Sequence, residues 1–260
     1  MYKHPLKSDP TLCRTLGRVG AVALALLVWQ ALTYLPTLSI LLASPLDVVI
    51  RLGSLVRESG FLGVVWFTFS RIVAGFGLGL VLGVVLGVLA GRLRWVETLL
   101  WPYMLTVKSV PVASFVVIVL IFFRLGVLST VISFLMVLPI IYTGTLEGIR
   151  ASDRDLDEMG AVFGVPFLRS LLYIRLPQIL PHIRAACRVA LGLCWKSGVA
   201  AELIGIPAGS VGEALYASKI YLDTTDLFCW TLLVVLISFA FEKCVLGLLG
   251  AAERVGRRVR

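Results

Sequence analysis

Residues 72–91 read IVAGFGLGLVLGVVLGVLAG, a stretch without any charged side chain. About 20 mostly apolar residues span the hydrocarbon core of a bilayer, so this stretch predicts a transmembrane helix. Glycine recurs at every fourth position, at Gly75, Gly79, Gly83 and Gly87, and positions four apart share one face of a helix. Small residues on one face allow another membrane helix to pack closely. A phosphate-binding glycine loop is excluded, because neither GxGxxG nor GxxxxGK followed by Ser or Thr occurs in the chain.

The same apolar character extends over the rest of the chain. Hydrophobic residues make up 59% of the sequence and charged residues 15%, against roughly 25% charged in an average soluble domain. Uncharged runs also cover 19–46 and 125–146, and apolar segments with a few ionisable residues cover 95–123, 184–206 and 227–249. No Ser/Pro-rich or acidic linker separates them. We therefore expect one continuous all-α membrane domain of about six transmembrane helices.

The basic residues lie at the ends of these apolar segments. The net charge of +9 could indicate nucleic acid binding, but the basic residues do not cluster on one soluble face, so no nucleic acid partner is expected. Basic residues are frequent before residue 19, at 92–94, between 150 and 188 and after 242, and sparse between these segments. The positive-inside rule therefore predicts that both termini are cytoplasmic. The basic start leads into an apolar run without a cleavage site, which is interpreted as a retained first helix.

Three regions follow from this topology. Residues 1–60 are expected to hold an N-terminal cytoplasmic segment, the first transmembrane helix and an outside connection. Residues 61–250 form the transmembrane domain, with an inside loop at 148–183, and residues 251–260 form a basic cytoplasmic tail. Short amphipathic helices are expected in the outside connections, at 44–55 and 211–222.

The histidines, the cysteines and the absence of known catalytic motifs disfavour an enzymatic function. The histidines are His4 and His182, and neither HExxH nor GxSxG occurs. The five cysteines form no CxxC pair and mostly lie in apolar sequence, so neither metal nor redox chemistry is indicated. No catalytic residue, metal or cofactor is expected in this chain.

The inside loop is longer than a simple turn between two membrane helices requires. Ser152 is predicted to cap a helix, with Asp155 completing a capping box, and further acidic residues lie near the positive end of that helix. Gly164 can end the helix in the left-handed conformation, and Pro166 suits the first turn of a second helix that runs to about Ile174. The loop is therefore expected to form a helix, a glycine turn and a second helix.

The spacing within this loop resembles the EAA motif of ABC importer permeases. The family pattern is E-A-A, three residues, G, nine residues, I, one residue, L-P, and the matching positions here are Glu158, Gly164, Ile174, Leu176 and Pro177. Two residues depart from the pattern, because Met-Gly replaces the two alanines, and the glycine weakens a helix by about 1 kcal/mol. Segments 70–76, 108–113 and 190–202 also resemble the nitrate, sulfonate, taurine and bicarbonate branch of this family, over roughly residues 44–250.

The resemblance implies a type I ABC importer fold in the bacterial inner membrane. Two copies of the chain, as a homodimer, would form the pathway, two cytoplasmic ATPase subunits would hold ATP and Mg, and an extracytoplasmic solute-binding protein would deliver the solute. The loop would dock into a groove of the ATPase as a coupling helix, through Asp155, Leu156, Asp157, Glu158, Met159, Phe163, Gly164, Val165, Pro166, Ile174, Leu176 and Pro177. The alternative is an interfacial helix on lipid, which the acidic first turn disfavours because anionic lipid repels it.

Lys108, Lys196 and Glu202 are the ionisable residues predicted deepest in the membrane, where such groups often mark a pathway. Because six helical steps separate Lys196 from Glu202, each is expected to find a partner on another helix. The alternative is that they form structural ion pairs or extend toward headgroups. The candidate pathway residues are Lys108, Ser109, Pro111, Trp195, Lys196 and Glu202. For Trp195, packing or lipid contact is favoured over recognition.

Two other functions stay open at this point. A channel or ion-coupled transporter also uses glycine-rich helices and buried charges, but it has no need of an ATPase dock. A permease of another ABC importer branch, for amino acids, metals or vitamin precursors, would share the loop motif. The sequence leaves the transported solute undetermined, although its basic residues favour an anion.

Overall fold

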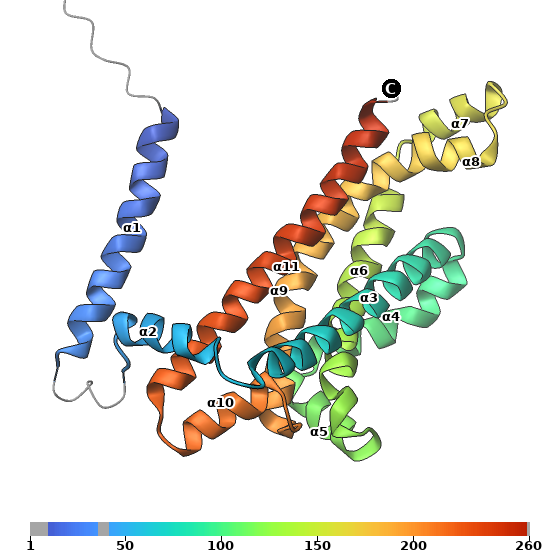
Figure 1. The fold of residues 1–260 in the computed structure, drawn as a ribbon. Coiled ribbons are helices and arrows are strands. Elements are labelled where there is room, and N and C mark those ends of the chain that lie inside the picture. The colour runs from blue at the N-terminus through green and yellow to red at the C-terminus, as the bar shows by residue number, and fades with distance from the viewer. Residues whose placement is uncertain (1–9, 36–41, 259–260) are drawn as a thin grey trace, which may run out of the picture.

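The computed structural model describes residues 10–35 and 42–258, which are helical and without strands (Figure 1). The elements are α1 (Pro10–Thr33), α2 (Pro45–Leu55), α3 (Phe61–Arg92), α4 (Arg94–Ser109), α5 (Val112–Phe122), η1 (Leu125–Val127), α6 (Leu128–Arg150), α7 (Arg154–Val162), α8 (Phe167–Ser170), η2 (Leu171–Arg175), α9 (Leu176–Gly205), α10 (Val211–Ile220) and α11 (Thr224–Arg258). The last two residues and the segments 1–9 and 36–41 lie outside this description. The all-α prediction is confirmed for the described residues.

The glycine face of α3 lies directly against α6. A Cβ atom added at Gly79 would lie 2.7 Å from Cγ1 of Val137, and one added at Gly83 would lie 2.8 Å from Cβ of Ile141. Gly87 faces Thr145 in the same way, at 2.7 Å. Cβ atoms do not approach other atoms this closely, so any side chain at these positions would force the two helices apart. By contrast, a Cβ atom at Gly77, on another face of α3, would meet nothing within 4 Å.

Helix α9 completes the core beside α6. Cys187, Ala190, Leu191 and Cys194 of α9 are each at most 1% exposed within the main hydrophobic cluster. Trp195 is also buried, and its ring lies 6.2 Å from that of Phe241 in α11. Helices α3, α6, α9 and α11 therefore form one packed unit.

Within residues 10–35 and 42–258, three helical segments are long and apolar enough to cross a membrane, namely Phe61–Arg92, Leu125–Arg150 and Thr224–Ala251. The expected span at 95–123 is not one straight helix, because α4 and α5 are bent by 107°. Val110 is extended between them, as sterics favour for a residue before proline, and Pro111 precedes α5. The pair therefore forms a broken span or a re-entrant loop.

The other two expected spans differ from their predicted bounds. Residues 36–41 of the expected span at 19–46 lie outside the described residues, and the described apolar part is the short segment Val19–Thr33. All but the last residue of the segment 184–206 lies within the longer helix α9, whose four charged residues from Arg184 to Glu202 lower its hydropathy. The six-helix count therefore stays a prediction.

Figure 1 shows α7, α8 and the C-terminal end of α11 at one end of the molecule, and α2 and α10 at the other. We call these the α7 end and the α10 end. The connection between α3 and α4 belongs to the α7 end, because Glu97 forms a salt bridge with Arg150 at the end of α6.

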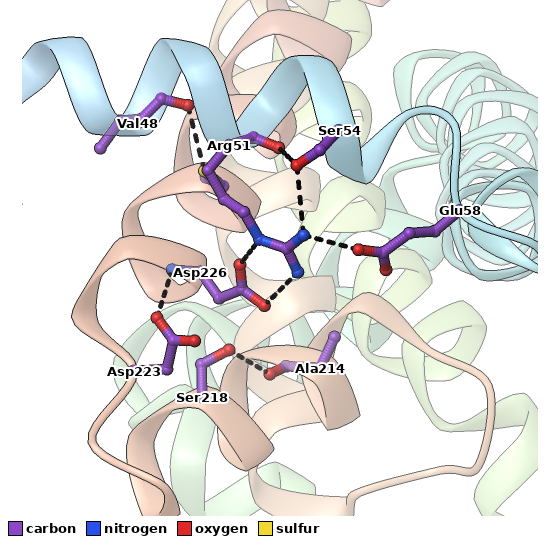
Figure 2. A network of polar contacts seen from close by, with 9 residues as sticks. Val48, Arg51, Ser54, Glu58, Ala214, Ser218, Asp223 and Asp226 are labelled. Atoms are coloured by element: carbon purple, nitrogen blue, oxygen red, sulfur yellow. Dashed lines mark hydrogen bonds and ion pairs between the residues drawn. The ribbon is translucent and has the colours of Figure 1, made fainter.

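A charged network holds α2 across the α10 end (Figure 2). Arg51 of α2 forms a salt bridge with Asp226 in the first turn of α11, where its Nη2 donates to Oδ2 at 3.0 Å. Its Nη1 donates to Glu58 at 2.6 Å and to Ser54 at 3.2 Å. The hydrogen bonds with Asp226 and Glu58 raise the pKa of Arg51, so the guanidinium group stays protonated. Asp223 accepts from the backbone N–H of Asp226 at 3.0 Å and thereby caps α11.

Candidate functional site

Helix α7 begins one residue later than the sequence predicts. Its N-cap is Asp153, whose side chain accepts from the backbone N–H of Asp155 at 3.0 Å. The predicted cap, Ser152, instead donates its hydroxyl to the carbonyl of Ile149 at 2.5 Å and completes the end of α6. An acidic cap suits this position, because a carboxylate is favourable at the positive end of a helix.

Gly164 ends α7 and reverses the chain. It has a φ of +64°, in the left-handed region that glycine adopts without a steric penalty. Its N–H donates to Ala161 at 3.1 Å, and the N–H of Val165 donates to Gly160 at 2.9 Å. These two bonds form a Schellman motif, in which a left-handed residue satisfies the last carbonyls of a helix.

The second helix of the loop does not stop at Ile174. Helix α8 continues through η2, a π-helical segment, into α9 without a break. The N–H of Leu176 donates to the carbonyl of Leu171, five residues earlier. Pro177 has no N–H to donate in the next position, and a local π turn is one way in which a helix accommodates such a residue. The second helix of the loop and α9 are therefore one continuous rod.

Three contacts hold α7 against this rod. Gln178 accepts from the backbone N–H of Asp153 at 2.7 Å, and Arg175 pairs with Asp157 at 3.1 Å. Gly160 is buried, and a Cβ atom there would lie 2.8 Å from Cδ1 of Ile174, so the departure from the EAA pattern gives a close packing contact. Neither Gln178 nor Arg175 is predicted from the sequence as a contact of α7. The opposite charges at 157 and 175 were visible in the sequence, but their contact depends on the fold.

The outer surface of α7 and α8 exposes large apolar side chains. Phe163 is 78% exposed and Val162 84%, whereas Leu156, one of the residues expected to dock into the ATPase, is half-buried. The carboxylates of Asp155 and Glu158 are exposed on the same short helix. We call the exposed apolar set the docking face, formed by Met159, Val162, Phe163, Phe167 and Leu168. Contiguous exposed apolar surface usually marks an interaction site.

Glu202 lies in a second polar site, inside the bundle and fully buried. Its carboxylate accepts from the hydroxyls of Thr68 and Ser129, each at 2.7 Å, and from the N–H of Gly212 at 3.3 Å. The Thr68 hydroxyl in turn accepts from the N–H of Val211 at 3.0 Å. Glu202 therefore joins α3, α6 and α9 to the N-terminus of α10, which favours a carboxylate. The expectation that Glu202 finds partners on other helices is confirmed, although these partners are hydroxyl groups and a backbone N–H and not a cation, and its pathway role stays a prediction.

Removing this carboxylate is expected to destabilise the bundle. Glu202→Ala leaves buried donors without an acceptor, at about 1–3 kcal/mol for each unsatisfied group. We expect a lower thermal midpoint and a reduced yield of monodisperse protein, with a smaller loss for Glu202→Gln, which keeps one acceptor oxygen. Lys196→Met is the control, because Lys196 is exposed on the same helix and its loss should change stability by about 0.5 kcal/mol or less. An unchanged midpoint for Glu202→Ala would refute the structural role.

The other candidate pathway residues lie in different surroundings. Nζ of Lys108 donates to Oγ1 of Thr143 in α6 at 2.7 Å, and the side chain is exposed, as is that of Lys196. Ser109 donates to the carbonyl of Thr106 at 3.1 Å, and Pro111 precedes α5 at the bend. Among the described residues, Lys108, Lys196 and Glu202 form no hydrogen bond or ion pair with one another.

Comparisons with known proteins agree with this architecture. A family model described as the binding-protein-dependent transport system inner membrane component matches residues 79–259. The chain is 33% identical to a putative aliphatic sulfonates transport permease protein of Escherichia coli, over 79% of this chain and 77% of that protein. It is 24% identical to the taurine transport system permease protein of the same organism, over 98% of this chain and 92% of that protein. A solved structure of an amino acid ABC transporter shares the fold, with a TM-score of 0.52, 15% identity and coverage of 79% of this chain and 96% of the other.

Proposed function

The chain belongs to the family of binding-protein-dependent transport system inner membrane components, and from this premise we propose that two copies of it form the pathway of an importer. It is a multi-pass membrane protein and the permease subunit of an ABC importer. Members of this family work with an ATPase and a solute-binding protein. In this proposal two ATPase subunits bind ATP and Mg, and the chain itself holds no cofactor.

The docking face is the observation that carries the coupling part of the proposal. It combines exposed aromatic side chains with exposed carboxylates at Asp155 and Glu158, which suits an apolar groove with basic residues at its rim. Because α8 continues into α9, a displacement of the docking face would be transmitted directly to a membrane helix. ATP-driven closure of the ATPase would in this way move α9 and so change the shape of the pathway.

The charge distribution supports a cytoplasmic α7 end. Arg92, Arg150, Arg154 and Arg169 lie in the segments at this end, and further basic residues begin α9. The described α10 end has fewer basic residues, and the Arg51 network neutralises one of them. The positive-inside rule therefore supports the proposal that α7 lies on the side of the ATPase and that both termini are cytoplasmic.

The solute is proposed to be a small sulfonate or a related anion or zwitterion. Relatives of this chain are named as permeases for aliphatic sulfonates, taurine and bicarbonate. Lys108 and Lys196 expose ammonium groups that would attract an anionic head group along the pathway. A permease of a different importer branch would be expected to match relatives that are named for other solutes.

Reconstitution tests this function directly. The chain is placed in proteoliposomes with the ATPase and binding protein encoded beside it, and uptake of labelled taurine, ethanesulfonate and bicarbonate is measured. We expect uptake of at least one of these solutes that requires ATP and the binding protein. Uptake without ATP, driven by an ion gradient, would favour an ion-coupled transporter instead.

A further inference from the structure

A hollow of about 350 Å³ opens between α4, α6 and α9, near the α7 end of the molecule. Its polar lining consists of Lys108 from the end of α4, Thr143 and Glu147 from α6, and His182 from the start of α9. The remaining wall is made of small or aliphatic residues, namely Ile140, Gly144, Ala185, Ala186 and Val189. This combination of an apolar wall with a few polar groups is typical of a site for a small molecule.

The two opposite charges that line this hollow, Lys108 and Glu147, form no salt bridge with each other. Nζ of Lys108 donates to Thr143 at 2.7 Å, and an ammonium group has two further hydrogens to donate. The Thr143 hydroxyl donates onward to the carbonyl of Pro139 at 2.7 Å, which fixes the position of its oxygen. Within the described part of the chain, Glu147 forms no ion pair with Lys108 or with any other basic residue.

Neighbouring groups leave both charges available. Arg150, one turn after Glu147, forms a salt bridge with Glu97 and not with Glu147. Nδ1 of His182 is buried without a hydrogen-bond partner among the described residues, which adds a polar atom beside the hollow. Gly144 of α6 and Ala186 of α9 pack closely along one wall of the hollow, because a Cβ atom on Gly144 would approach the Cβ atom of Ala186 to 2.5 Å.

We propose that this hollow is a solute subsite for a small zwitterion, in which Lys108 binds the anionic group and Glu147 binds the ammonium group. An anion alone would be attracted by Lys108 but repelled by Glu147, whereas a zwitterion satisfies both charges. The aliphatic wall suits the short methylene chain that separates the two groups. The inference rests on the proposed import function and narrows its solute to the class of amino sulfonates and amino carboxylates.

Direct binding tests this subsite without the binding protein. The permease is purified in complex with its ATPase, placed in lipid nanodiscs, and titrated with taurine, ethanesulfonate and ethylamine by calorimetry. Hydrogen bonds to charged groups contribute enough to change an affinity by about tenfold or more. We expect taurine to bind at least about tenfold more tightly than either singly charged analogue.

Two variants separate the roles of the two charges. Lys108→Met should weaken both taurine and ethanesulfonate, by about tenfold or more. Glu147→Gln should weaken taurine selectively and remove its advantage over ethanesulfonate. Lys219→Met is the matched control, because this lysine is exposed on α10 at the opposite end, and it should bind all three probes like the unmodified chain.

Co-purification of the ATPase shows that each variant is folded and assembled. Equal affinities for taurine and ethanesulfonate in the unmodified complex, or an unchanged preference in Glu147→Gln, would overturn the subsite. If that complex still imports a solute with ATP, the subsite alone fails and the proposed function stands. Failure of the unmodified chain to bind its ATPase would instead count against the proposed function.

Discussion

Replacing Gly79 with leucine is expected to prevent stable assembly of the α3–α6 pair. The first side-chain atom would already lie 2.7 Å from Cγ1 of Val137 and 3.3 Å from the backbone nitrogen of Leu138. Overpacking a core costs about 1–3 kcal/mol when neighbours can shift, and here one neighbour is backbone, so we expect a cost of about 3 kcal/mol or more. The measurement is the thermal midpoint of the purified permease, which should fall by about 6–12 °C.

Gly77→Leu is the matched control for this substitution. Gly77 lies two residues earlier in the same helix, and nothing lies within 4 Å of a Cβ atom added there. Both variants therefore change helix propensity and hydrophobicity equally, and only Gly79→Leu should lower the thermal midpoint by this amount. Equal midpoints for the two variants would show that close contact between α3 and α6 is unimportant for stability.

Local sequence patterns were sufficient to predict the ends of several helices. The N-terminal cap of α2 follows from Ser44 and Pro45, and the left-handed end of α7 follows from Gly164. Such features depend on a few neighbouring residues, and steric and hydrogen-bonding rules alone determine them. The break at Pro111 was missed because proline is tolerated in many membrane helices, so the residue itself does not reveal a bend of 107°.

The long-range polar contacts could not be predicted from local sequence patterns. Glu202 was expected to find a partner on another helix, but the sequence does not identify the hydroxyls on α3 and α6 and the end of α10 that bind it, as far as 134 residues away in the sequence. Arg51 and Asp226 are 175 residues apart, and the sequence around neither residue indicates that the other is its partner. Such contacts follow from how helices are arranged in space, which a single sequence does not specify.

Removal of the docking face is expected to uncouple the permease from its ATPase. In the variant Met159→Ala/Phe163→Asp, an exposed apolar anchor is replaced by a charge that cannot enter an apolar groove without a large desolvation cost. Central aromatic anchors of an interface contribute at least about 2 kcal/mol, so we expect the affinity for the ATPase to fall by more than about tenfold. The measurement is the fraction of ATPase that co-purifies with the permease, together with ATP-dependent uptake in proteoliposomes.

A control at the opposite end separates docking from general damage. Tyr221 is 82% exposed beyond the end of α10, so Tyr221→Asp adds the same charge at a similarly exposed aromatic position without touching α7. Gly164→Pro provides an independent second variant, because proline cannot adopt the φ of +64° that closes the Schellman motif. We expect both α7 variants to insert into the membrane but to lose the ATPase, and Tyr221→Asp to retain it. Because α8 and α9 form one rod, normal transport by both α7 variants would mean that force reaches the pathway through another contact, and the coupling role of α7 would be rejected.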